Sequence, residues 1–551
     1  MKFNNPENKR AFPTQGILFE ILFQTKFFMY FAGFFLLMFV SLLSFSQEKK
    51  RVDIEQADFL ESNEKIASNA QRLVGNVRIR HENILMWCDS AYTYTGTNRV
   101  DAFGNVHINQ ADTVDLYARK VYYNGDNSEA RAYHNVRLIN KSTTLFTDTL
   151  YYDMDANIGY YDNHGKIVDS TNTLTSVIGK YFVDTDIAHF YREVEGFSDK
   201  YTLTSDTLQY NTKTGLIFIE GPTTIRDSLN TLYAEKGWYD TNTGEAELLK
   251  KPVVYNETQQ LTANYIKYNE TDGNGRALGN VKIEDFENKI IVTGKTSDYN
   301  EKLEIATVTD SALFIMYSEK DTLFLHADTL KTIPDIVEDE KIIMAYYGTR
   351  FFRSDIQGIC DSLIYFTKDS LVQLFKNPVI WSDAHQLTAD HIEMQQHTNS
   401  PDELHLKNNS FIISKLDSGR FDQIKGKEMT GLVVQNKLDR IDVNGSGQML
   451  YYAREEEDII GLNRTESSKI SIQFREGKVF RTAFLQSPEG VLKPLFELTE
   501  EEKTLAGFEW KIHLRPLSKH DVFEKTEEIP VPPKESQTEK EAEIIPVEKI
   551  E

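Results

Sequence analysis

Residues 263–283, with the sequence ANYIKYNETDGNGRALGNVKI, contain the pattern that decides the fold of this chain. Polar and apolar residues alternate around Ile266 and Tyr268, which places these two side chains on one face of a β-strand. A polar turn follows, and a second run leads into Gly-Asn-Val. Because Gly and Asn accept positive φ angles, Gly279-Asn280 predicts a bulge at which a strand bends from one sheet into a facing one.

The pattern recurs with a period of 29 residues. Seven tyrosines occupy one phase of the repeat: Tyr94, Tyr123, Tyr152, Tyr181, Tyr210, Tyr239 and Tyr268. The Gly-Asn-Val element keeps step at Gly75, Gly104 and Gly279, and its variants begin at His134, Gly221 and Lys251. One unit is too small to bury its apolar face, but stacked units bury a continuous one. We therefore expect an all-β chain in which about eleven units, between residues 57 and 394, form an elongated two-sheet stack.

Charge and hydropathy limit the function classes. A net charge of -23 argues against nucleic acid, whose phosphates need a basic face, and against simple electrostatic attachment to an anionic bilayer. Residues 27–45 contain no charged side chain, which predicts an export segment. The segment is either a signal peptide cut near residue 46 or an uncleaved membrane anchor. The small residues Ser41, Ser44 and Ser46 favour cleavage, and in both cases the bulk of the chain leaves the cytoplasm.

The two cysteines, Cys88 and Cys360, occupy the same phase of the repeat and lie 272 residues apart. In a linear stack this separation corresponds to roughly 40 Å. A disulfide tolerates a Cα separation of only about 7 Å. We therefore predict two free, buried thiols.

The regularity of the repeat ends near residue 400. We expect a signal peptide or anchor at 1–46, a repeat domain at 47–400, and a second β region at 401–516 that continues or caps the stack. Residues 517–551 are rich in Glu, Lys and Pro and have no period, so they are expected to be a disordered tail.

No catalytic or metal-binding group of residues stands out from the repeat. Three histidines spaced six residues apart give only a weak metal signal on strands: His385, His391 and His397. Four aspartates recur with the repeat: Asp89, Asp148, Asp206 and Asp361. An active site needs one local cluster of carboxylates rather than a feature repeated along the chain, so we expect these aspartates to mark the polar start of each strand. No enzyme activity, metal or cofactor is predicted.

The repeated tyrosine strand, polar turn and Gly-Asn-Val strand resemble the OstA-like proteins. This lipopolysaccharide-transport family includes LptA and the N-terminal domain of LptD, and the resemblance covers residues 52–395. It implies a V-shaped β-jelly roll, or β-taco, with an open hydrophobic groove. It also implies subunits or partners joined end to end to carry lipopolysaccharide across the periplasm, without catalytic residues. The chain is longer than a simple bridge, and it lacks the many further strands of an outer-membrane barrel.

By this analogy, apolar residues of the repeat would line a groove for acyl chains: Val106, Ile108, Val136, Leu138, Leu150, Tyr152, Leu208, Tyr210, Ile266, Tyr268, Val281 and Ile283. The resemblance implies lipopolysaccharide or a related acyl lipid as ligand, with other transport components or further copies of the chain as partners. The implied location is the periplasm or cell envelope of a Gram-negative bacterium. Two alternatives stay open. The chain could be a structural or adhesive envelope protein whose tyrosines only stabilise a closed core, or a carbohydrate-active β-helix enzyme.

Overall fold

The computed structural model describes residues 51–62, 69–228, 230–318, 321–335, 340–397, 400–435, 437–455, 458–475 and 478–524. These residues form antiparallel strands and a few short 3-10 turns, which confirms the predicted all-β fold. None of them belongs to a helix that could cross a membrane. The export segment predicted at 1–46 lies outside the described residues. The chain divides into two compact units, residues 1–138 with 151–156 and residues 139–150 with 157–551.

The first unit is a meander of long strands that bend in the middle. Its strands are β1 (Asp53–Gln56), β2 (Phe59–Ser62), β3 (Ala70–His81), β4 (Ile84–Tyr94), β5 (Arg99–Gln110) and β6 (Val114–Asn124), while β7 (Glu129–Asn140) and β8 (Thr143–Asp153) have residues in both units. The register between β3 and β4 shifts between Val74 and Val77, where Gly75 and Asn76 have φ angles of 80° and 45°. The bulge predicted from Gly-Asn is confirmed.

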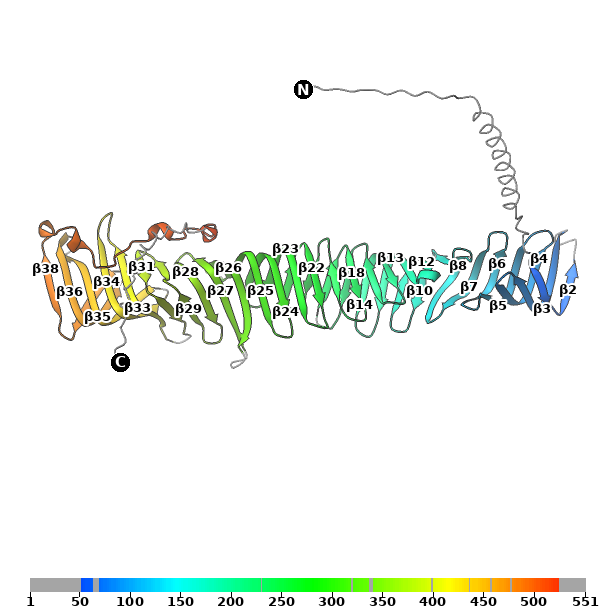
Figure 1. Cartoon of the computed structure of the whole chain (residues 1–551), viewed down its shortest axis with the longest axis horizontal. Coiled ribbons are helices and arrows are strands. Elements are labelled where there is room, and N and C mark those ends of the chain that lie inside the picture. Colours follow the sequence, from blue (N-terminus) through cyan, green and yellow to red (C-terminus); the bar gives the residue numbers. More distant parts are fainter. Residues whose placement is uncertain are drawn as a thin grey trace, which may run out of the picture. The chain divides into compact units, whose positions relative to one another are not determined.

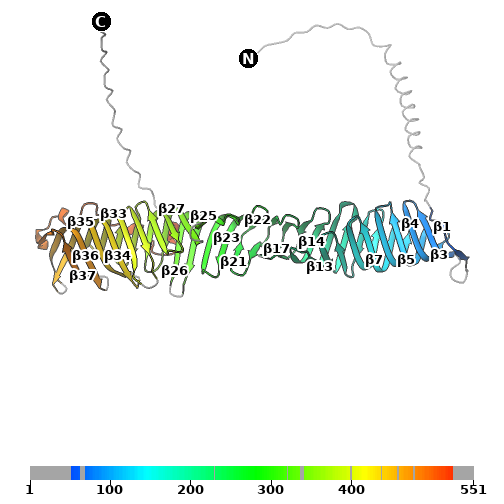
Figure 2. The same ribbon diagram turned by 90° about the horizontal axis from the view of Figure 1, so that it is seen from below.

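The second unit continues the same pattern, and in both views of the chain its strands follow one another along one axis (Figures 1 and 2). Most of its first strands are short, and β13 and β14 are the exceptions: β9 (Ile158–Tyr161), β10 (Gly165–Val168), β11 (Thr173–Ser176), β12 (Ile178–Phe182), β13 (Ile187–Phe197), β14 (Thr202–Asn211), β15 (Leu216–Ile219), β16 (Thr223–Arg226), β17 (Thr231–Ala234), β18 (Gly237–Asp240), β19 (Ala246–Leu248), β20 (Val253–Tyr255), β21 (Gln259–Thr262) and β22 (Tyr265–Asn269), with the 3-10 turn η1 at Val183–Thr185. Several of them are halves of one bent strand. For example, β15 and β16 both pair with β14, and Pro222, which cannot donate to a ladder, lies between them.

The remaining strands of this unit, most of them longer, are β23 (Asn274–Asp285), β24 (Ile290–Asn300), β25 (Ile305–Tyr317), β26 (Thr322–Asp335), β27 (Glu340–Phe352), β28 (Gln357–Phe366), β29 (Leu371–Phe375), β30 (Val379–Ser382), β31 (His385–Thr388), β32 (His391–Gln395), β33 (Asp402–Lys415), β34 (Phe421–Val434), β35 (Lys437–Glu455), β36 (Asp458–Arg475), β37 (Lys478–Leu485) and β38 (Glu489–Lys493). The region predicted as a second β domain pairs directly with the repeat, because β33 pairs with both β31 and β32.

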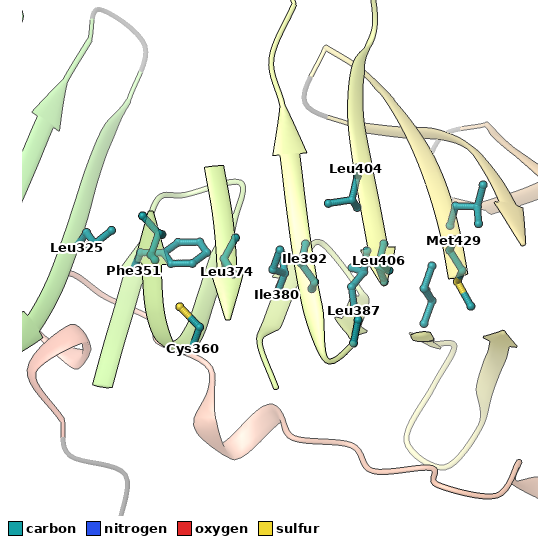
Figure 3. Packing of buried hydrophobic residues seen from close by; sticks show 14 of the residues in the cluster. Leu325, Phe351, Cys360, Leu374, Ile380, Leu387, Ile392, Leu404, Leu406 and Met429 are labelled. Carbon is teal, nitrogen blue, oxygen red and sulfur yellow. The ribbon is translucent and has the colours of Figure 1, made fainter. Parts of the chain in front are cut away.

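In each unit the bulges divide the bent strands into two half-sheets. We call half-sheet I the set that contains residues 77–81 of β3 in the first unit and residues 281–285 of β23 in the second. Half-sheet II is the set that contains residues 70–74 of β3 and residues 274–278 of β23. Alternate side chains of both half-sheets point inward. Figure 3 shows such residues from successive strands of the second unit, among them Leu325, Phe351 and Leu374.

Both cysteines are buried and free, as predicted. Burial raises the pKa of the Cys88 thiol to about 11 and that of the Cys360 thiol to about 12. Cys360 is part of the inward-facing core in Figure 3.

After β38 the chain turns back over the outer surface of half-sheet I as a segment that we call the C-terminal strap, residues 494–524. It contains four 3-10 turns: η2 (Leu495–Glu497), η3 (Glu501–Lys503), η4 (Ile512–Leu514) and η5 (Asp521–Phe523). Leu505 of the strap packs on Phe411 and Leu450, which point away from the interior. The strap corrects the predicted start of the tail, because residues 517–524 are folded and Val522 is fully buried. Residues 525–551 lie outside the described part of the chain.

Candidate functional site

A cavity of about 1360 Å³ lies between the two half-sheets of the second unit and is lined by residues between 227 and 367. Its walls are apolar side chains from both sides. Half-sheet I contributes Leu232, Leu261, Ile283, Ile290, Val292, Phe314 and Met316, and half-sheet II contributes Ile266, Val308, Leu330 and Ile343. Pockets for drug-sized ligands measure about 300–1000 Å³, so this cavity has room for a larger apolar ligand.

Polar residues line the cavity at the ends of the strands, away from the bulges. On half-sheet I, Asp227 directly follows β16 and Asp285 ends β23. On half-sheet II, the turn between β24 and β25 contributes Glu301 and Glu304, and Asp335 ends β26. The cavity thus combines an apolar interior with a charged rim, as an amphipathic ligand requires.

Within each unit, tyrosines of the ladder connect the two half-sheets across the interior. Four tyrosine hydroxyls of the ladder form hydrogen bonds with polar residues near strand ends of the opposite half-sheet: Tyr123 with His81 Nδ1 (2.7 Å), Tyr152 with Gln110 Oε1 (2.9 Å), Tyr181 with Asn140 Nδ2 (3.1 Å) and Tyr210 with Asn172 Nδ2 (2.7 Å). Tyr210 also donates to Asp169. Burial raises the pKa values of Tyr123 and Tyr210, so both hydroxyls stay protonated at neutral pH. We call these contacts the tyrosine latches.

The latch pattern changes at Tyr268. Asp227 lies 41 residues before Tyr268, the same separation as in the Tyr181–Asn140 latch, and both Asp227 and Tyr268 line the cavity. The Tyr268 hydroxyl instead donates to Glu301 Oε2 (2.6 Å) on its own half-sheet. Tyr268 thus lies on the cavity wall with its hydroxyl bound to its own half-sheet rather than across the interior.

The twelve residues predicted to line a groove fall into two groups. Ile266, Tyr268 and Ile283 lie on the cavity wall. Nine others are at most 2% exposed and fill closed parts of the interior: Val106, Ile108, Val136, Leu138, Leu150, Tyr152, Leu208, Tyr210 and Val281. The polar partners of the tyrosines were not predicted. They could have been predicted from one sequence pattern, because His81, Gln110, Asn140 and Asp169 follow the repeat at intervals of 29 or 30 residues.

Repeated aspartates such as Asp89 and Asp361, and the three histidines, have partners close by. Asp89 accepts a hydrogen bond from the bulge residue Asn105 (3.0 Å), and Asp361 forms an ion pair with Lys376 (2.9 Å). His385 contacts Ser414 Oγ (2.7 Å). Within the described ranges, no group of three or more His, Cys, Asp or Glu side chains is arranged to hold a metal ion. The four aspartates lie inside β4, β8, β14 and β28 and not at their first residues, so the prediction that they mark the polar start of each strand is wrong. The Asp89 and Asp361 contacts fit a structural role within these strands.

Comparison with known proteins gives a family match and a distant structural likeness. Residues 49–206 match the model of the OstA-like protein family. Among solved structures, the chain is similar to LptH from Pseudomonas aeruginosa, described as the LptA homologous periplasmic component of the conserved lipopolysaccharide transport device. The identity is 16%, the match covers 21% of this chain and 83% of LptH, and the TM-score is 0.19. Comparison with curated proteins gives no match. The resemblance to the OstA-like proteins stated from the repeat is thus confirmed over residues 49–206.

Proposed function

We propose that this chain binds the acyl chains of a lipopolysaccharide-type lipid in the cavity at residues 227–367 and takes part in transporting that lipid through the cell envelope. The observation that carries the proposal is an apolar cavity of about 1360 Å³ in a chain with an OstA-like region. Each buried methylene group contributes about 0.8 kcal/mol to binding, so even a part of one acyl chain supplies substantial affinity.

The proposal extends to location and partners. The proposed location is the periplasm, and no enzyme activity is proposed. The OstA-like region and the export segment predicted at residues 27–45 support both parts of this proposal. Other components of a lipopolysaccharide-transport system, or further copies of this chain, are the proposed partners. The open ends of the sheet at β1 and β38 are the places where such partners would add strands.

Neighbouring residues of one strand provide a matched test. Val292 lines the cavity, and Ile291 precedes it in β24, so its side chain points to the opposite face of the sheet. Val292→Asp places a carboxylate in the apolar interior and should abolish lipid co-purification from envelope fractions, as measured by mass spectrometry. Ile291→Asp makes the same chemical change outside the cavity and should retain the lipid. Circular dichroism should show that both variants keep their β-structure.

One observation favours a second candidate, a structural envelope protein with a closed core. The tyrosine latches and the nine fully buried residues show that much of the interior holds only protein side chains. If wild-type protein carries no acyl lipid after gentle purification and takes up none when lipid is added, the structural candidate replaces the carrier.

A further inference from the structure

The outer surface of half-sheet II in the first unit carries a group of partly exposed aromatic side chains. Asp101 pairs with both Tyr92 and Tyr122, so these two tyrosines lie on one surface of the alternate strands β4 and β6, about 10 Å apart. The Tyr122 ring contacts that of Tyr133 in β7, with 5.7 Å between the ring centroids. We call this surface the aromatic face, and its rings are Tyr92, Phe103, Tyr122, Tyr133 and Tyr151.

The rings of the aromatic face meet edge to face and are not stacked. The interplanar angle between Tyr122 and Tyr133 is 76°. On the outer surface of half-sheet I, by contrast, His107 stacks between Trp87 and Tyr117 at interplanar angles of 18° and 4°. A ring inside a stack has both faces covered, whereas an edge-to-face pair leaves ring faces free to contact a ligand. Only the aromatic face thus offers open ring surface in this way.

Two cations lie among these rings. The Lys120 Nζ is 4.3 Å from the centroid of the Tyr122 ring, and the Arg131 guanidinium is 5.7 Å from the centroid of the Tyr151 ring. In the part of the chain that the structure describes, neither cation forms an ion pair with a carboxylate. A cation held over a ring still has N–H groups that can donate to an anion. On a chain with a net charge of -23, this face is a place where an anionic group can be bound.

The composition of the aromatic face fits a sugar polymer that carries few charges. The rings outnumber the unneutralised cations, so the matching ligand has more rings to pack than anionic groups to pair. Sugar rings pack their C–H groups on aromatic faces, and their hydroxyls form hydrogen bonds with tyrosine hydroxyls and carboxylates. Asp101, which accepts from the Tyr94 hydroxyl (2.7 Å), is such an acceptor on this face. A densely charged polymer such as nucleic acid would be repelled by the acidic remainder of the chain.

We infer that the aromatic face binds an acidic polysaccharide in which only some of the sugar rings carry a carboxylate, with Lys120 and Arg131 as the partners of those carboxylates. The inner side of the same strands is filled by Leu73, Ala102 and Val121, which are fully buried. No acyl chain can lie beneath the aromatic face, so the sugar is not the head of a lipid held in these strands. The inference is therefore independent of the proposed lipid site.

Three probes of equal length test the inference by isothermal titration calorimetry with full-length protein at physiological ionic strength. A hyaluronan hexasaccharide carries a carboxylate on every second sugar, chitohexaose is a neutral sugar polymer, and a thymidine hexanucleotide carries rings on a densely charged backbone. The hyaluronan hexasaccharide should bind about tenfold more tightly than either of the other two. Equal or tighter binding of chitohexaose or of the hexanucleotide would overturn the inference, and so would the absence of hyaluronan binding.

Charge variants locate the site. Lys120→Gln combined with Arg131→Gln should lower the affinity for the hyaluronan hexasaccharide to that for chitohexaose. The control, Arg137→Gln combined with Lys166→Gln, removes the same two charges from half-sheet I, where each cation also lies over an aromatic ring, at 5.1 Å in both cases. It should bind the hyaluronan hexasaccharide as wild type does, and an equal loss in the control would overturn the assignment to the aromatic face.

A ring variant tests the aromatic contribution separately. Tyr122→Thr combined with Tyr133→Thr keeps residues that favour strands but removes two rings. This variant should bind the hyaluronan hexasaccharide and chitohexaose each about tenfold more weakly than wild type. Circular dichroism should show unchanged β-structure in all variants. Full binding by a folded ring variant would overturn the inference, and the charge variant, which keeps every ring, tests it even if the ring variant does not fold.

Discussion

Two buried glutamines hold the C-terminal strap against half-sheet I. Gln423 is 1% exposed, its Nε2 donates to the Lys503 carbonyl (2.9 Å), and its Oε1 accepts from the Leu505 N–H (2.8 Å). Gln386 makes the same pair of contacts, to the Glu509 carbonyl and the Lys511 N–H, both at 2.7 Å. Each side-chain amide thus pairs with the strap as the backbone of a neighbouring strand would.

Replacing Gln423 with Leu keeps a side chain of similar size but removes both partners of the strap backbone. A buried polar group left without a partner costs about 1–3 kcal/mol, so two such groups cost roughly 2–6 kcal/mol if the strap stays docked. If the strap separates from the sheet, water can form hydrogen bonds with both backbone groups, and this limits the loss of free energy that can be measured. We therefore expect the free energy of strap opening to fall by about 2–4 kcal/mol, with little change in the rest of the sheet.

Amide hydrogen exchange of full-length protein measures this opening directly. In Gln423→Leu, the amides of residues 503–508 should exchange about 30-fold to 1000-fold faster than in wild type, whereas amides of β24 should be unaffected. Gln473→Leu, at an exposed position of β36, serves as the matched control and should leave strap protection unchanged. Wild-type protection of the Leu505 amide in Gln423→Leu would refute the view that this side chain holds the strap.

Three further predictions concern the closed core. Tyr181→Phe removes the hydroxyl that accepts from Asn140 and should lower the unfolding free energy by about 1 kcal/mol in urea titration; an unchanged midpoint would argue against a stabilising latch. Cys88 and Cys360, with pKa values of about 11 and 12, should resist iodoacetamide at pH 8 until the protein is unfolded, and modification of the native protein would contradict their burial. Burial raises the pKa of Asp422 to about 6, so the native state binds more protons than the unfolded state between about pH 4 and 6, and this group should lower stability by about 2–3 kcal/mol as pH rises through that range. The difference in unfolding free energy between wild type and Asp422→Asn should follow this pH dependence, and a difference independent of pH would contradict it.

The local features of this fold could be predicted from the sequence because they depend on short-range chemistry. Alternation around Ile266 and Tyr268 indicates a strand, and Gly-Asn supplies the two positive φ angles that a bulge needs. The shared Cys-Asp-Ser motif also placed Cys88 and Cys360 at equivalent positions of the repeat, from which their free, buried state followed.

The position of the cavity and the path of the strap were decided by tertiary structure. The tyrosines of the ladder share one local sequence pattern but do not share one kind of partner. The Tyr181 hydroxyl forms a hydrogen bond with the opposite half-sheet, and the Tyr268 hydroxyl forms one with its own half-sheet. The choice depends on which partner lies within reach of the hydroxyl, and both partners are distant in the sequence: Asn140 lies 41 residues from Tyr181, and Glu301 lies 33 residues from Tyr268. The strap has no period at all. Its irregular backbone binds side chains that lie far away in the sequence, among them Gln386 and Gln423, and Gln423 lies 80 and 82 residues before its two partners.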